Sequence, residues 1–201
     1  MLAKIQKGIR ILSRRISQQG VYVSFLWMFG RGLPMLTGKP ILRFSEVTPQ
    51  LYVGPQYRKN GLDYLKSQGI QAVVNLRIEK DDAKLGLAPA NYCYLPTVDD
   101  EAPSPEHLEQ GVRFIAGMIS RGERVYIHCG AGVGRPPTMV AAYLFSSGMT
   151  LDRALGPLRK LRPFIFITPP QMQALAKFEK QAAEKALTPL ASPLASGSTQ
   201  P

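Results

Sequence analysis

The hydrophobic positions near the start of the chain repeat with the period of an α-helix. Apolar residues recur at steps of three and four, with basic side chains elsewhere on each turn: Leu2, Ile5, Ile9, Leu12 and Ile16. This spacing predicts a basic amphipathic helix over residues 2–16. An apolar run over 21–29 follows, but two glycines and a proline between positions 30 and 34 interrupt it. The run is well short of the ~20 apolar residues that a membrane-spanning helix needs.

From Glu46 onward the pattern changes to short apolar runs that alternate with stretches of helical period, which is typical of an α/β sheet with crossover helices. Strands are predicted over 50–53, 71–76, 92–95 and 125–128. Helices are predicted over 62–67, 105–120, 136–146, 151–161 and 171–185. Ser104 and Thr150 are residues of the type that caps a helix N-terminus.

The length of 201 residues fits one α/β domain with tails. We expect a basic amphipathic segment over 1–45 and a single domain over 46–187. Residues 188–201 are rich in Pro, Ser and Ala without periodicity, so we expect them to be disordered.

Basic residues are concentrated at the N-terminal end. Eight of the 25 Lys and Arg residues precede Glu46, the first acidic residue, whereas the remaining 17 are nearly balanced by 14 Asp and Glu. A net charge of +11 distributed in this way indicates an interaction segment. We therefore expect peripheral contact with an anionic membrane through residues 1–45, and no nucleic acid as a partner. An interfacial helix, a mitochondrial transit segment and a helix packed on the domain surface all fit the pattern.

One short segment combines residues of catalytic character. The predicted strand 125–128 is followed by Cys129, a loop of small residues and Arg135 at a helix start; the loop consists of Gly130, Ala131, Gly132, Val133 and Gly134. The glycines allow successive backbone N–H groups to point at one anion, and the helix dipole adds to the attraction. The same field favours the nucleophilic thiolate form of Cys129. The planar guanidinium of Arg135 can hold two oxygens of a phosphoryl group.

His128 is expected to hold this loop by hydrogen bonding, because an ionised thiolate needs no general base. A lone cysteine at a strand end is commonly a small core residue. Here, however, the cysteine coincides with the arginine six positions later, the glycines and the change from strand to helix. The coincidence favours a catalytic phosphate-binding loop.

The spacing of His128, Cys129 and Arg135 resembles the HCx5R loop of the protein tyrosine phosphatase superfamily, in its dual-specificity branch. The similarity extends from Glu46–Gly54 to the turn at Leu161-Arg162-Pro163. It implies an α/β fold with a mostly parallel central sheet flanked by helices, to which this chain adds its basic N-terminal extension. It also implies a phosphocysteine intermediate formed without a metal or cofactor.

Such a reaction needs an acid that protonates the leaving oxygen and later activates water. Asp99, Asp100 and Glu101 occupy an acidic, proline-rich loop after the strand 92–95. The resemblance favours Asp99, which stands where this branch carries its acid, and Asp100 stays as the alternative. Adjacent acidic residues otherwise indicate a solvated loop.

Pro136 departs from the resemblance, because the superfamily usually carries Ser or Thr directly after the signature arginine. Proline suits the first turn of a helix, but it cannot donate a hydrogen bond to the departing thiolate. We therefore expect slow hydrolysis of the phosphoenzyme unless Thr138 or water substitutes.

Two further residues are ambiguous in the sequence. Arg77 ends the predicted strand 71–76, so it either lines the rim of the site or lies on the surface. Cys93 is interpreted as a buried core residue rather than a redox partner of Cys129. Two cysteines are too few for a disulfide framework, and a working thiol needs a reducing compartment, so we expect an intracellular, cytoplasmic protein.

The predicted function is hydrolysis of phosphate monoesters on phosphotyrosine, phosphoserine or phosphothreonine proteins. The runs Thr97-Val98-Asp99 and Arg124–Cys129 also resemble the mitochondrial phosphatidylglycerophosphate phosphatases. A lipid phosphatase acting at a membrane surface is therefore one alternative. A pseudophosphatase or adaptor that binds phosphorylated partners without turnover is another.

Overall fold

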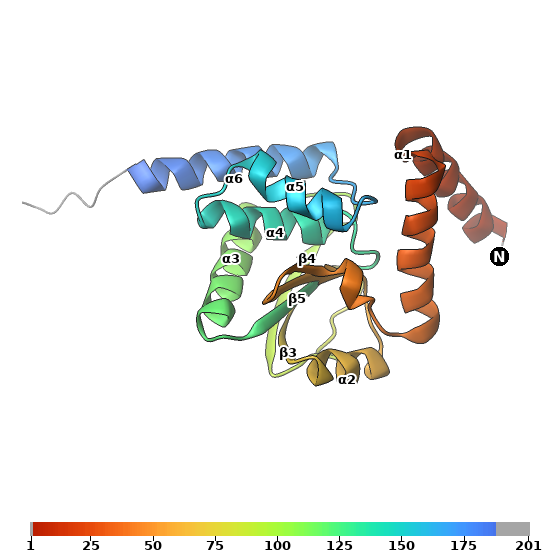
Figure 1. Ribbon diagram of the computed structural model, residues 1–201, viewed down its shortest axis with the longest axis horizontal. Helices are drawn as coiled ribbons and strands as arrows, with labels where there is room; N and C mark the ends of the chain where they lie inside the picture. Colours follow the sequence, from red (N-terminus) through yellow and green to blue (C-terminus); the bar gives the residue numbers. More distant parts are fainter. Residues whose placement is uncertain (1, 188–201) are drawn as a thin grey trace, which may run out of the picture.

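The computed structural model describes residues 2–187, so the predicted disordered tail lies outside the described residues. Five strands form one sheet in the order β1-β2-β5-β3-β4 (Figure 1). The strands are β1 (Glu46–Thr48), β2 (Leu51–Gly54), β3 (Ile70–Arg77), β4 (Asn91–Thr97) and β5 (Arg124–His128). Only β1 is antiparallel to its neighbour. The mostly parallel sheet expected from the resemblance is confirmed, although β1 was not predicted.

Helices cover both faces of the sheet, and those predicted from residue 46 onward are confirmed within a few residues at their ends. One face is covered by α3 (Pro105–Ser120), α4 (Arg135–Ser146), α5 (Leu151–Leu161) and α6 (Pro169–Leu187), and the other by α2 (Lys59–Ser67) (Figure 1). Alternate side chains of β5 point to opposite faces. Val125 and Ile127 belong to the larger apolar cluster, whereas Tyr126 belongs to the smaller one beneath α2.

The two predicted helix caps differ in outcome. Ser104 caps α3 as expected, since its side chain accepts a hydrogen bond from the backbone N–H of His107 (3.2 Å). Thr150 occupies the N-cap position of α5, but its side chain makes no capping hydrogen bond. Instead, the backbone N–H of Leu151 donates to Oε1 of Glu179 on α6 (2.9 Å). A carboxylate supplied by a neighbouring helix therefore replaces the cap predicted from local sequence.

The N-terminal helix α1 (Leu2–Thr37) contains the predicted basic helix and continues through the apolar run and Pro34. Gly20 has non-helical dihedral angles (φ 82°, ψ 166°) and separates two helical halves. The second half lies against the domain (Figure 1). Nε2 of Gln19 donates to the carbonyl of Ile165 (3.2 Å), and Gly30 lies against the ring of Phe164. Of the helices in residues 2–187, none combines the length and apolarity required to cross a membrane.

The structure does not describe the side chains of Leu2, Ile5, Ile9 and Leu12, so the amphipathic face of this helix stays a prediction. The boundary between residues 45 and 46 also stays a prediction. A short 3-10 turn (Leu42–Phe44) connects α1 to β1.

Candidate active site

The carboxyl ends of three adjacent parallel strands bring the candidate catalytic residues together. β5 lies in the middle of the sheet, with β3 beside it and β4 beyond β3. Parallel strands end at the same edge of a sheet, which is where open α/β folds bind their ligands. Cys129 follows β5, Glu79 follows β3 and Asp99 follows β4. The strand order therefore places all three around one site.

The loop after β5 curls into a nest of backbone N–H groups ahead of α4. Cys129 is buried, and the backbone N–H of Gly132 donates a hydrogen bond to its Sγ (3.3 Å). Gly132 has a φ of +70°, and a Cβ at this position would overlap the carbonyl group of Gly54. A side chain is therefore excluded here by both the backbone conformation and the lack of space.

Backbone hydrogen bonds from two neighbouring segments fasten this loop. The N–H of Gln56, after β2, donates to the carbonyl of Gly130 (3.3 Å), and the N–H of Phe166, ahead of α6, donates to the carbonyl of Val133 (2.8 Å). Because these bonds to the surrounding fold fix the conformation of the loop, a ligand would bind to a preorganised site.

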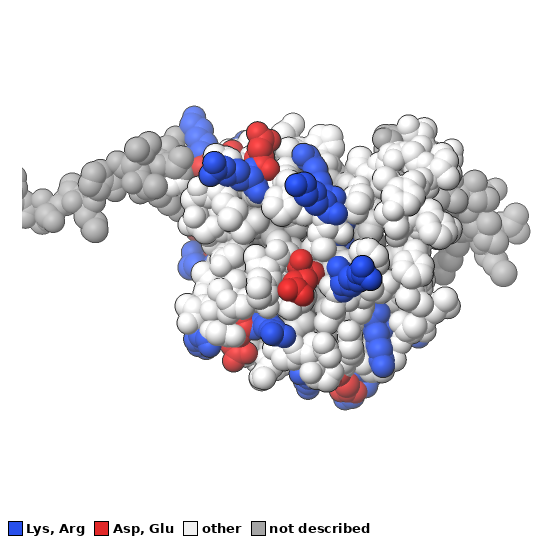
Figure 2. Space-filling view, in the orientation of Figure 1, with Lys and Arg blue, Asp and Glu red and all other residues white. Residues whose placement is uncertain are grey.

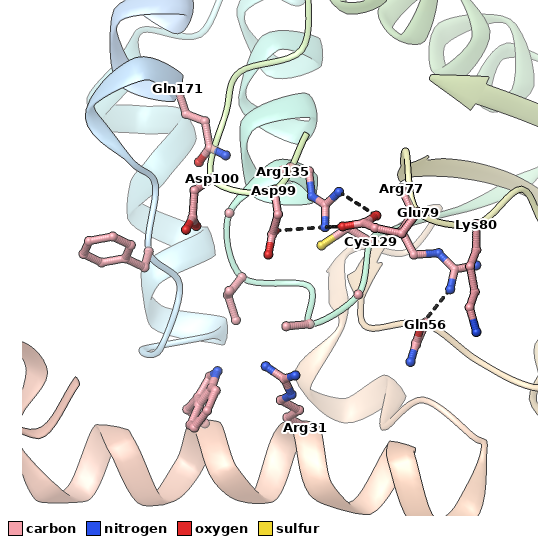
Figure 3. A pocket seen from close by; sticks show the side chains of 16 residues that line it. Arg31, Gln56, Arg77, Glu79, Lys80, Asp99, Asp100, Cys129, Arg135 and Gln171 are labelled. Carbon is pink, nitrogen blue, oxygen red and sulfur yellow. Dashed lines mark hydrogen bonds and ion pairs between the residues drawn. The ribbon is translucent and has the colours of Figure 1, made fainter. Parts of the chain in front are cut away.

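Arg135 is the first residue of α4, and its guanidinium is only 2% exposed. Nη1 donates to the carbonyls of Leu76 (3.2 Å) and Thr97 (2.8 Å) at the ends of β3 and β4. Glu79 accepts from both terminal nitrogens (3.2 and 3.3 Å), and Oδ1 of Asp99 lies 2.9 Å from Nη2 (Figure 3). Nε is buried and makes no hydrogen bond within the described part of the chain. The Nε–H group of Arg135 can thus donate a hydrogen bond to a ligand.

The charges around Arg135 reinforce one another. Burial disfavours the charged guanidinium, but Cys129, Glu79 and Asp99 outweigh that effect and raise the pKa of Arg135. Partial burial likewise opposes ionisation of Glu79, yet its hydrogen bond to Arg135 and the nearby positive charges lower the pKa of this carboxyl. Glu79 is therefore ionised at neutral pH.

A second buried cluster lies beneath the loop. Asp82 forms an ion pair with Arg77, and its Oδ2 lies 2.8 Å from Nε2 of His128. All three side chains are at most 4% exposed. Burial lowers the pKa of His128, against the opposing influence of Asp82, so the imidazole is neutral at pH 7. Asp82 thus links the end of β3 to the residue that precedes Cys129.

The structure places the three loop acids differently. Asp99 is the one that reaches Arg135. Asp100 also lines the cavity, but it has a positive φ (66°) and its carbonyl accepts a hydrogen bond from Thr168 (2.7 Å). The carbonyl of Glu101 accepts from Gln171 of α6 (3.0 Å). The loop is therefore fastened through its backbone, and only Asp99 contacts the guanidinium.

Arg77 lines the cavity and is buried, so the surface alternative for this residue was wrong. Its Nη1 donates to Oε1 of Gln56 (2.6 Å). Burial also raises the pKa of Cys93 to about 11, as expected of a core thiol. Glu79 and Asp82 were not singled out from the sequence. The one sequence feature that could have indicated them is their position shortly after a buried strand.

These residues surround a cavity of about 340 Å³. Its walls come from the catalytic loop, the segments after β2, β3 and β4, and the residues Phe166 and Gln171. Trp27 and Arg31 of α1 complete the lining (Figure 3). A helix outside the predicted domain therefore forms one wall of the site. Among the described residues, no three His, Cys, Asp or Glu side chains are grouped to hold a metal ion.

Comparisons with known proteins point to one family of phosphatases. Residues 50–149 match a family model described as "Polymorphic toxin system, DSP-PTPase phosphatase". The chain is 39% identical over 94 residues to human phosphatidylglycerophosphatase and protein-tyrosine phosphatase 1, covering 46% of this chain and 47% of the relative. It is 33% identical over 121 residues to rat dual specificity protein phosphatase 12, covering 59% and 36%. The chain thus spans about half or less of the length of these curated relatives.

Solved structures show the same fold. The crystal structure of PTPMT1 matches with a TM-score of 0.63 and 27% identity, covering 71% of this chain and 97% of that one. Tk-PTP in the active form matches with a TM-score of 0.57 and 30% identity, covering 63% and 89%. Human DUSP28, at 19% identity and a TM-score of 0.60, is similar in fold.

The buried cluster generates a prediction about stability. In Asp82→Asn the carboxylate is lost, and Arg77 is left as a buried cation without its partner. Removing one member of a buried ion pair costs about 3–5 kcal/mol, so we expect the free energy of unfolding in urea to fall by that amount. Asp63→Asn, which removes an exposed carboxylate from α2, should change it by no more than about 0.5 kcal/mol. Equal stabilities of the two variants would contradict this account.

Proposed function

This chain belongs to the dual-specificity branch of the cysteine-dependent protein tyrosine phosphatases, and we propose that it hydrolyses phosphate monoesters through a phosphocysteine intermediate. The supporting observation is the convergence at one strand edge of the Cys129 sulfur, the loop amides and a fixed guanidinium. The free Nε of Arg135 and its neighbouring Nη2 form a fork that suits two phosphoryl oxygens.

In the first step the Cys129 thiolate attacks phosphorus and the bond from phosphorus to the leaving oxygen breaks. Asp99 in its acid form gives its proton to that oxygen. In the second step Asp99 accepts a proton from water while the water oxygen attacks phosphorus, and the bond from sulfur to phosphorus breaks. Inorganic phosphate and the thiolate are released. His128 positions the loop through Asp82 and takes no proton.

Asp99 must leave Arg135 for this sequence to run. Its carboxylate now occupies one nitrogen of the guanidinium, and the side chain is 73% exposed, so it can turn. Phosphate binding at Arg135 displaces Asp99 and leaves it beside the leaving oxygen. On the other side of the guanidinium, the carbonyl groups of Leu76 and Thr97 still accept hydrogen bonds from Nη1.

The experiment that tests this proposal compares two aryl phosphates. We expect Cys129→Ser to abolish turnover, and Asp99→Asn to lower kcat by about 10²–10⁴-fold on phenyl phosphate. The loss should be smaller on para-nitrophenyl phosphate, because its leaving group needs little protonation. Asp100→Asn is the matched control. A larger loss in Asp100→Asn would assign the acid to that residue, and binding of phosphate without turnover in the unmodified chain would indicate a pseudophosphatase.

Pro136 leads to a second kinetic expectation. Thr138, the nearest alternative hydroxyl in the sequence, donates to the carbonyl of Gly134 in its own helix (2.9 Å). It is therefore already engaged, and the slow second step expected from the sequence stays a proposal.

We expect burst kinetics with para-nitrophenyl phosphate. Pro136→Ser should speed breakdown of the phosphoenzyme about ten- to hundredfold, because a hydrogen bond to a charged group contributes about 1.5–3 kcal/mol. Pro137→Ser, one position further along α4, is the control. Rapid-quench measurements that find no phosphoenzyme in the unmodified chain would contradict the expectation.

Phosphorylated proteins are the first proposed substrates, in line with the names of the dual-specificity relatives. A phospholipid is the second candidate. Human phosphatidylglycerophosphatase and protein-tyrosine phosphatase 1 is named for a lipid substrate, and a PTPMT1 structure, 27% identical to this chain, contains PI(5)P. For this chain, the specific observation that favours a lipid is the surface of α1.

The second half of α1 exposes a row of large apolar side chains on the side away from the domain. Val21, Tyr22, Phe25 and Leu36 are 57–82% exposed. Figure 2 shows this part of the surface almost without charged side chains. Apolar patches of this kind mark interaction sites, and the eight basic residues before Glu46 favour an anionic surface. We propose that α1 contacts an anionic membrane.

Vesicle binding tests this contact. We expect Phe25→Ser combined with Phe29→Ser to lower affinity for phosphatidylglycerol vesicles at least tenfold, because burying one large apolar side chain contributes about 1.5–3 kcal/mol. Met149→Ser, between α4 and α5, removes a similarly exposed side chain (43%) and should retain binding. Salt-independent binding to neutral vesicles would remove the electrostatic part of the proposal. Self-association through this face, detected by sedimentation, would contradict the proposed contact with a membrane.

A further inference from the structure

The lining of the catalytic cavity includes cationic side chains besides Arg135. Four cationic side chains line it: Arg31, Arg77, Lys80 and Arg135 (Figure 3). Arg77 is neutralised by Asp82, and Arg135 is paired with Glu79 and Asp99. No ion pair among the described residues includes Arg31 or Lys80.

Arg31 is held at the cavity by the way α1 docks. Its guanidinium lies over the indole ring of Trp27, 5.5 Å from the ring centroid, and both side chains line the cavity. Figure 3 shows Arg31 projecting from α1 toward the loop that carries Cys129. Gly30, the preceding residue, lets the helix lie directly against the ring of Phe164. A stacked arginine on a docked helix is preorganised to bind an anion.

Lys80 lies on another wall of the same cavity, directly after Glu79 in the segment that follows β3. Its ammonium group is on an exposed, flexible stem, so it can follow a ligand held by Arg31. Asp100 also lines the cavity, but no ion pair among the described residues joins it to Arg31 or Lys80. Both cations therefore stay available when a phosphoryl group displaces Asp99 from Arg135.

We propose that Arg31 and Lys80 form a second anion-binding subsite, which recognises a phosphodiester in the leaving group of the substrate. This inference rests on the phosphatase function proposed above. The order of groups in the structure is the catalytic loop, then Arg31, then the apolar outer face of α1. A phospholipid whose head group ends in a phosphomonoester has the same order: scissile phosphate, phosphodiester, acyl chains. The subsite thus selects lipids that carry two phosphates.

The test uses two soluble lipids below their micelle concentrations. Dihexanoyl phosphatidylglycerophosphate carries both phosphates, whereas dihexanoyl phosphatidic acid carries only the scissile one. We expect Arg31→Ala to lower the ratio of kcat/KM for the first lipid to that for the second by about ten- to hundredfold, the range for a lost charge-assisted hydrogen bond. The loss should lie in KM. Arg31→Lys should restore part of it, and Lys80→Ala should act in the same direction.

Arg159→Ala is the matched control, because it removes an exposed arginine from α5, away from the cavity, and it should leave the ratio unchanged. An equal loss on both lipids, or an unchanged ratio in Arg31→Ala, would overturn the subsite. The same dependence on Arg31 with a doubly phosphorylated peptide, and none with the lipid, would overturn the lipid assignment.

Calorimetry separates this inference from the proposed reaction. In a Cys129→Ser background, binding of dihexanoyl phosphatidylglycerophosphate should weaken about tenfold or more when Arg31→Ala is added. Absence of aryl phosphate turnover in the unmodified chain would contradict the proposed function. The difference in binding between the two variants would still support or overturn the subsite.

Discussion

The buried guanidinium of Arg135 is the charge around which the site is organised. A permanently charged side chain that is 2% exposed needs partners. It finds them at the ends of two strands, as carbonyl groups of Leu76 and Thr97, and in the carboxylates of Glu79 and Asp99. Any change in the order of β5, β3 and β4 would separate these groups. The sheet topology and the phosphate site therefore depend on one another.

The helix α1 contributes to the active site although it lies outside the predicted domain, which begins at Glu46. The chain from Glu46 onward contains the sheet and the whole catalytic loop, yet two wall residues of the cavity, Trp27 and Arg31, precede it. A segment that would otherwise be considered a detachable tail completes the site. Its outer face is apolar and Arg31 lines the cavity on its other side, so the membrane contact proposed for α1 would connect the catalytic cavity to a surface that presents a lipid substrate.

The parts of the site that could be predicted are those encoded in one continuous segment. The nest, the thiol and Arg135 lie within seven consecutive residues, where local geometry follows from glycine and from the change of strand to helix. Glu79, Asp82 and Arg31 could not be predicted, because their roles depend on which strands are neighbours and on where α1 docks. Thr150 illustrates the same limit, since Glu179 from another helix binds the N–H that a local cap would have bound.

The two carboxylates that contact Arg135 are not held equally. Asp99 is 73% exposed and contacts one nitrogen of the guanidinium, whereas Glu79 is 47% exposed and accepts from both terminal nitrogens. A phosphate dianion is a stronger partner for the guanidinium than one carboxylate, because it offers three oxygens and two negative charges. Substrate binding would therefore displace Asp99 toward the leaving oxygen, while Glu79 keeps the guanidinium in place.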